Sequence, residues 1–203
     1  MSGAFSVRRS FIWIFIIANV VLFLLFRFKQ DSMRIGLPAE ASRSPVLATL
    51  EPFSLTRESG EAFSSSELEG GPWVANFIFT RCPNQCPMMT ARLATLQSSM
   101  PPEVKIVSFS VDPLYDAPDV LKSYARKFGA DPRRWVFLTG DKEAIRRVRA
   151  DFKLGESDDP ALHSLRFVLV DGKRRVRGYY DSEGTDSLKK FLKDVRAVWS
   201  DHE

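Results

Sequence analysis

The sequence has few of the residues that define disulfide-stapled secreted domains or nucleic-acid-binding proteins. Among 203 residues there are only two cysteines and two histidines. Two cysteines exclude a multi-disulfide framework and a structural four-cysteine zinc site. The charge excess is also small, with 29 Lys and Arg against 25 Asp and Glu, and few aromatic residues interleave with the basic ones. We therefore predict no nucleic-acid partner, and the 44% apolar content indicates an ordered globular protein.

A long apolar run does occur near the N-terminus. Residues 11–26 read FIWIFIIANVVLFLLF, with Asn19 as the only polar residue. As a helix this run covers roughly 24 Å, slightly less than the ~30 Å hydrocarbon core, and Arg27 and Lys29 can snorkel to the interface. A cleaved signal peptide is the alternative, but no small-x-small cleavage site follows. The run therefore predicts an uncleaved transmembrane helix.

This segment divides the chain into four parts. We expect a cytoplasmic N-terminus (1–10), a transmembrane anchor (11–28), a linker (29–45) and one folded domain (46–203). Basic residues on both sides of the anchor do not fix its orientation by themselves. Only ten residues precede the span, which leaves no room for a mitochondrial presequence. The expected location is thus a bacterial inner membrane, with the domain in the periplasm.

The folded domain alternates buried apolar runs with amphipathic ones. The apolar runs predict strands at residues 73–79, 103–111 and 135–138. The amphipathic stretches predict helices at 89–100, 116–129, 142–152 and 185–199. Asp171-Gly172 predicts a hairpin between strands 165–170 and 174–180. The pattern indicates an α/β fold whose mixed sheet is mainly parallel, with an antiparallel edge and flanking helices.

Both cysteines lie at a strand-to-helix junction, in the segment TRCPNQCPM. Cys82 and Cys86 follow a predicted buried strand and open a predicted helix. The positive end of that helix, together with Arg81, is expected to make both thiolates easy to form. At positions i and i+4 the sulfurs can share one turn, where they can form a disulfide or bind one soft metal ion. The spacing does not choose between these, and two ordinary buried cysteines are the remaining alternative.

One histidine is a candidate third ligand. His163 precedes the first hairpin strand, whereas His202 is the penultimate residue and fits a chain tail. His163 is also compatible with a loop histidine that has no ligand role. Two thiolates and one imidazole form an open three-coordinate set, which favours Cu(I), tolerates Cu(II) and suits zinc less well. Copper is therefore the expected metal.

Four successive blocks of the domain read FIFTRCPNQCPMM, SVDPLYDAPDVLKSYARKFG, WVFLTGD and HSLRFVLVDGKRRVRGYYD. These blocks resemble the Sco/SenC family of membrane-tethered, thioredoxin-like copper proteins, and the similarity runs from about Phe53 to the end. The resemblance implies a thioredoxin-like fold and a copper site formed by Cys82, Cys86 and His163. It also implies a role in maturing the dinuclear copper centre of cytochrome c oxidase. The implied partners are the oxidase's copper-site subunit and an upstream copper donor or thiol reductant.

Three positions near the cysteines carry further expectations. Asn84 stands where the family usually has Asp, so a carboxylate between the thiols is missing, which is expected to shift redox poise or copper affinity. Asp112 and Asp116 match a family block. The simpler interpretation makes Asp112 part of a strand-end turn and Asp116 a helix N-cap, and Asp112 could also line the site.

The residues support two functions from different classes. In the first, the protein is a copper-binding assembly factor that uses Cys82, Cys86 and His163 to hold copper and pass it on. In the second, it is a thiol–disulfide oxidoreductase, in which one cysteine attacks a partner's disulfide and the other resolves the mixed disulfide. Only the first function needs His163. A peroxidase is a weaker third alternative, because a C-x-x-x-C motif keeps the second thiol close rather than on a distant element.

Overall fold

The structure is a computed structural model that describes Asn19, Phe23 and residues 45–154 and 165–202. One compact unit spans Ser44–Glu203. In the part of the chain that is described, no helix is long and apolar enough to cross a membrane. The predicted anchor at 11–28 lies, apart from Asn19 and Phe23, outside the described residues, so the structure does not test it.

The described domain alternates strands and helices as the sequence predicts. In chain order its elements are β1 (Ala48–Thr49), β2 (Ser54–Arg57), β3 (Ala62–Ser64), η2 (Ser65–Leu68), β4 (Trp73–Ile78), α2 (Gln85–Leu96), η3 (Gln97–Ser99), β5 (Lys105–Ser110), α3 (Pro118–Lys127), β6 (Trp135–Thr139), α4 (Lys142–Asp151), β7 (Arg166–Val170), β8 (Arg175–Asp181) and α5 (Thr185–Ser200).

These strands form one mixed sheet. Its strand order is β1-β8-β7-β4-β5-β6-β2-β3. The central strands β4, β5 and β6 are parallel, and every other pairing in the sheet is antiparallel. The predicted α/β class, the mixed sheet and its antiparallel edge are therefore confirmed. The expectation of a mainly parallel sheet is wrong, because only two of the seven pairings between the described strands are parallel.

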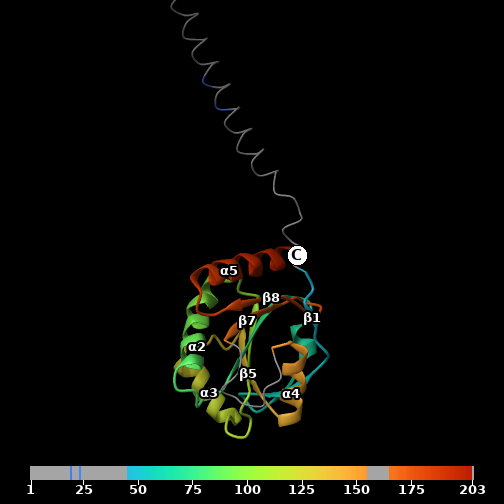
Figure 1. Cartoon of the computed structure of the whole chain (residues 1–203), viewed down its shortest axis with the longest axis vertical. Helices are drawn as coiled ribbons and strands as arrows, with labels where there is room; N and C mark the ends of the chain where they lie inside the picture. The colour runs from blue at the N-terminus through green and yellow to red at the C-terminus, as the bar shows by residue number, and fades with distance from the viewer. Residues whose placement is uncertain (1–18, 20–22, 24–44, 155–164, 203) are drawn as a thin grey trace, which may run out of the picture. The chain divides into compact units, whose positions relative to one another are not determined.

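Helices cover both faces of the sheet, and each face has its own apolar cluster. Figure 1 shows α2 and α3 on one side of the sheet and α4 on the other. On the first face Met89, Leu121 and Phe191, from α2, α3 and α5, pack in one cluster. On the second face Ile145 and Val148 of α4 pack in another cluster. The residues of β4 alternate between the two clusters, because successive side chains of a strand point to opposite faces.

The hairpin predicted around Asp171-Gly172 is present as β7 and β8. β7 ends at Val170 and β8 begins at Arg175, so four residues connect the strands. The residue with positive φ is Arg174, at 58°, rather than Gly172. Glycine is needed at 172 for another reason, because a Cβ there would lie 2.7 Å from the backbone nitrogen of Gly71. The turn and the chain before β4 are thus in direct backbone contact.

Candidate metal and redox site

The cysteines lie in the connection between β4 and α2. This connection follows the carboxyl end of β4, one of the three parallel strands, and α/β folds commonly place their functional groups at this end. It turns sharply, with the N–H of Cys82 donating to the carbonyl of Phe79 at 3.2 Å. Helix α2 begins at Gln85, so Cys86 lies in its first turn whereas Cys82 precedes it. The expectation that both cysteines belong to one helical turn is therefore wrong for Cys82.

The two cysteines are nevertheless in contact. The backbone N–H of Cys86 donates to the Cys82 sulfur at 3.3 Å. Both are reduced cysteines and both are buried, with 8% of Cys82 and none of Cys86 exposed. The side chain of Asn84, the N-cap residue of α2, makes no capping hydrogen bond. The sulfur of Cys82 instead accepts a hydrogen bond from the first turn of the helix, as a capping oxygen would. Two soft donors thus lie together at a helix N-terminus, as a disulfide or a thiophilic metal requires.

The surroundings make the two thiols chemically different. Burial alone would raise the pKa of Cys82, but hydrogen bonds from the backbone N–H groups of Cys86, Asn84 and Gln85 outweigh it and lower the pKa. Burial raises the pKa of Cys86 to about 12, and the neighbouring Cys82 adds to this effect. The expectation of two easily formed thiolates is correct for Cys82 and wrong for Cys86. The reason is that Cys86 is sealed inside the apolar cluster between α2 and the sheet.

A buried carboxylate fixes the start of the cysteine loop. Asp116 has no exposed surface. It accepts hydrogen bonds from the hydroxyl and the N–H of Thr80, the latter at 3.1 Å, and from the hydroxyl of Ser110 at 2.6 Å. It therefore ties the ends of β4 and β5 to the start of α3. The expected N-cap role of Asp116 is wrong, because Ala117 is the N-cap residue of α3.

A charged and aromatic group flanks the loop on the outside. Asp112 forms the expected strand-end turn, with its carbonyl accepting from the N–H groups of Tyr115 and Asp116. Its carboxylate pairs with Arg81 at 2.6 Å. The guanidinium of Arg81 also lies 4.4 Å from the centre of the Tyr115 ring. Arg81 is thus held by Asp112 and Tyr115.

Asn84 lies at the exposed N-cap position of α2 and makes no side-chain cap hydrogen bond. Its contribution to Cys82 comes from the backbone, since the N–H of Asn84 lowers the pKa of that thiol. The amide side chain brings no negative charge close to the sulfurs. This is consistent with the lowered pKa of Cys82, because an added carboxylate would favour the neutral thiol.

The third expected ligand is His163, which lies outside the described residues. Strand β7 is antiparallel to β4, with Trp73 opposite Val170 and Ala75 opposite Val168. Arg166 therefore enters the sheet toward the carboxyl end of β4, where the cysteines lie, and it follows His163 by three residues in the sequence. No group of three His, Cys, Asp or Glu residues suited to a metal occurs within the described ranges. The described donors are the two sulfurs, a set that fits a soft ion such as Cu(I).

The sequence and fold match known proteins over most of the domain. The SCO1/SenC family model matches residues 42–200. The SCO1 protein homolog of Bacillus subtilis (strain 168) is 33% identical over 165 residues, which cover 77% of this chain and 86% of that protein.

Solved structures of Sco proteins are also similar to this chain. BsSco, described as a member of the Sco family of cytochrome c oxidase assembly proteins with a disulfide switch, is 31% identical, with a TM-score of 0.68 over 77% of this chain and 97% of that one. Copper-bound ScoI of Bradyrhizobium japonicum is 25% identical, with a TM-score of 0.61 over 74% and 99%. The mixed sheet, its flanking helices and the family match together show that this chain belongs to the SCO1/SenC family.

Proposed function

We propose that the protein is a copper-binding assembly factor that delivers copper to, or prepares, the dinuclear copper site of cytochrome c oxidase. The observation that carries the proposal is the contact between Cys82 and Cys86 at the start of α2, where two soft donors lie together. The copper-bound relative and the oxidase-assembly relative support the metal and the partner. Copper is cargo in this proposal, received from an upstream donor and taken by the oxidase's copper-site subunit.

His163 completes the proposed site as the third ligand. The support for this role is that β7 starts toward the cysteine end of β4, three residues after His163 in the sequence. Two thiolates suit Cu(I), and an added imidazole makes Cu(II) acceptable. The proposed location remains a bacterial inner membrane, with residues 11–28 as the anchor and the domain in the periplasm.

Copper titration of the reduced protein tests this function. We expect one copper per chain and Cu(II)–thiolate charge-transfer bands in the visible spectrum of the wild type. Cys82→Ser and Cys86→Ser should each abolish the bands. His163→Ala should weaken copper binding by more than the ~10–100-fold typical of losing an outer-shell group. Copper affinity and spectrum unchanged in His163→Ala would overturn the three-ligand site.

A thiol–disulfide oxidoreductase is the second candidate, and the unequal thiols favour it. The lowered pKa of Cys82 suits the attacking thiolate, which would break a partner's disulfide and form a mixed disulfide. Cys86, after losing its proton, would attack the Cys82 sulfur and release the partner as a dithiol. The partner gains two electrons and this chain ends as a Cys82–Cys86 disulfide, which a separate thiol reductant must reduce.

A His163 variant distinguishes the two functions. Dithiol exchange needs both cysteines but no imidazole, so His163→Ala should retain its rate of exchange with a disulfide peptide while losing copper. The matched control is Cys86→Ser, which should stop at the mixed disulfide. A His163→Ala protein that loses exchange and copper binding together would contradict this division.

A further inference from the structure

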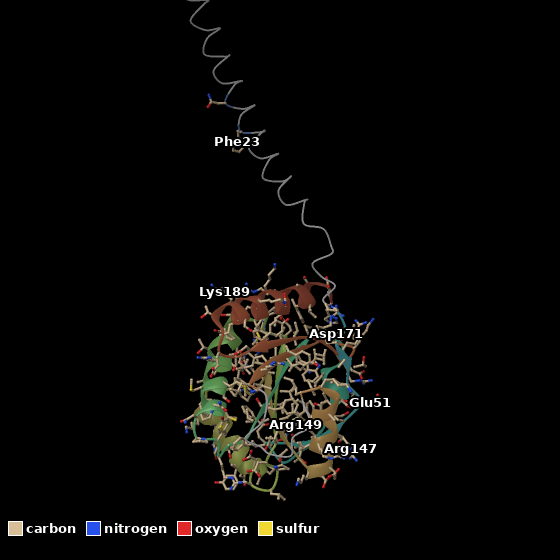
Figure 2. All side chains as sticks on the ribbon, viewed as in Figure 1. Phe23, Glu51, Arg147, Arg149, Asp171 and Lys189 are labelled. Carbon is tan, nitrogen blue, oxygen red and sulfur yellow. The ribbon has the colours of Figure 1, made fainter. Side chains whose placement is uncertain are left out.

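A hollow with charged side chains in its lining lies at the other end of the sheet from the cysteines. It has a volume of about 240 Å³ and is bounded by the β7–β8 turn, the chain before β4 and the end of α5. Figure 2 labels Asp171 on the side of the domain where β1 and the C-terminal part of α5 lie. Since β4 starts beside this hollow and ends at the cysteine loop, the whole strand separates the two places.

Basic residues of the β7–β8 turn and of β8 contribute to the lining of this hollow. The segment 173–177 reads KRRVR. Lys173, Arg175 and Arg177 line the hollow, and His202 adds a further nitrogen donor. Against these stand the carboxylates of Asp171 and Asp201. Three permanent cations therefore face two anions within one small cavity.

Asp171 holds the guanidinium groups in place. It pairs with the Nε of Arg175 at 2.8 Å and with a terminal nitrogen of Arg177 at 3.4 Å. It also accepts from the backbone N–H groups of Lys173 and Arg175. Asp171 is buried, so this carboxylate is a fixed element of the turn. The side chains of the two arginines are thereby oriented before any ligand arrives, which lowers the entropy cost of binding.

Several donors around the hollow remain unused. The Nε of Arg177 is buried and has no hydrogen-bond partner within the described ranges, on a side chain that is 11% exposed. Within the same ranges, the ammonium of Lys173 has no ion-pair partner, and Arg175 pairs only through its Nε. Buried donors normally find a partner, but this Nε is closed to solvent, so the donors open to a ligand are the terminal nitrogens of Arg175 and the ammonium of Lys173. Forked guanidinium donors match the oxygens of carboxylates and phosphates.

We propose that this hollow binds a phosphate group. The pocket lies where the chain enters the domain, because Thr49 of β1 is paired with Arg175 of β8. The phosphate can come from the headgroup of an anionic phospholipid or from free phosphate. The lipid source rests on the proposed membrane anchor, whereas the phosphate chemistry does not. A headgroup bound here would turn the opposite end of the sheet, with the cysteines, away from the membrane.

Calorimetric titration of the full chain in maltoside micelles, reduced and free of copper, tests the proposal. One arm uses inorganic phosphate, and the other uses monomeric dihexanoyl phosphatidylglycerol with dihexanoyl phosphatidylcholine as the zwitterionic control. We expect binding in at least one arm and a dissociation constant at least tenfold higher in Arg175→Gln/Arg177→Gln. Lys173→Gln, an exposed position, should raise it about threefold without affecting folding.

A matched control removes two cations elsewhere. Lys189→Gln/Arg146→Gln changes two exposed residues outside the hollow and should bind as the wild type does. Loss of binding in the hollow variants with phosphatidylglycerol alone identifies the headgroup, and loss with inorganic phosphate alone identifies the free anion. Absence of binding in both arms, or equal binding by all variants, overturns the proposal. Copper binding by the hollow variants should be unchanged. A negative result in this experiment would therefore overturn the phosphate site without affecting the proposed copper function.

Discussion

At the scale of single residues, the reactivity of the site is set by what surrounds each sulfur. Cys82 and Cys86 differ by four positions and belong to the same apolar cluster. Three backbone N–H groups outweigh the burial of Cys82, whereas the complete burial of Cys86 outweighs its one backbone hydrogen bond, with Phe79. The lowered pKa of the first and the raised pKa of the second follow from these surroundings. In the metal-free protein, the first thiol to ionise is therefore Cys82.

Alkylation of single-cysteine variants measures this difference. In reduced, copper-free Cys86→Ala, the rate of Cys82 alkylation by iodoacetamide should reach half its maximum below pH 9.0, the ordinary value for a thiol. In Cys82→Ala, burial still raises the pKa of Cys86 although the contribution of Cys82 is lost, so this thiol should stay almost unreactive at pH 9.0. The backbone N–H of residue 86 remains in the first variant, so its hydrogen bond to Cys82 is kept. Equal rates for the two cysteines at pH 8 would contradict the asymmetry.

The carboxylate of Asp116 stabilises the cysteine loop by accepting hydrogen bonds from Thr80 and Ser110. An asparagine amide at this position has only one oxygen to accept them. Asp116→Asn should lower the free energy of unfolding by about 1–3 kcal/mol, because the NH₂ group would face the hydroxyl and N–H donors of Thr80 and Ser110. Denaturant unfolding of the full chain provides the measurement. The matched control is Asp119→Asn in the first turn of α3, an exposed acid whose removal should cost about 0.3–1 kcal/mol. An equal decrease in the free energy of unfolding in the two variants would show that the buried hydrogen bonds of Asp116 contribute no more to stability than one exposed acid does.

The sequence predicts features of these residues that depend on neighbouring positions, but not features that depend on contacts between residues far apart in the chain. The C-x-x-x-C spacing is a local pattern, and the structure confirms that the two cysteines are in contact. The bonds from Asp116 to Thr80 join residues 36 positions apart. The burial of Cys86 likewise comes from packing against the sheet. Neither effect leaves a pattern in the local sequence.

At the scale of elements, long patterned segments were predictable and short edge strands were not. The predicted strand at 135–138 and helix at 142–152 correspond to β6 and α4 within one residue at each end. The strands β1, β2 and β3 were missed, since they have two to four residues and mix polar with apolar positions. Their pairing is decided by the neighbouring strands β8 and β6 rather than by their own composition.

The β7–β8 turn depends on the absence of a side chain at residue 172. In Gly172→Ala the new Cβ would lie 2.7 Å from the Gly71 nitrogen and 2.9 Å from the Gly70 carbonyl carbon. Both contacts are with backbone, which cannot rotate away, so the variant should lose about 1–3 kcal/mol of stability. Gly71→Ala is the control, because its nearest neighbour would be Trp199 at 3.8 Å. Thermal unfolding should leave the control within about 0.5 kcal/mol of the wild type.

At the scale of the whole molecule, the folded unit holds its own core. Both apolar clusters consist of residues between Ala48 and Trp199, with one cluster on each face of the sheet. A domain of about 150 residues buries enough apolar surface to fold without disulfides. The core that stabilises the fold therefore lies within the domain itself.

Removal of the predicted anchor and linker should separate attachment from folding. A protein beginning at Ser44 should unfold in one cooperative transition and bind one copper, with the same spectrum as the full chain. The full chain should stay in the membrane pellet after alkaline carbonate extraction, because sixteen nearly uninterrupted apolar residues at 11–26 favour the bilayer. The shortened protein should appear in the soluble fraction. A full chain extracted by carbonate would refute the anchor, and a shortened chain with no cooperative transition would refute the independence of the domain.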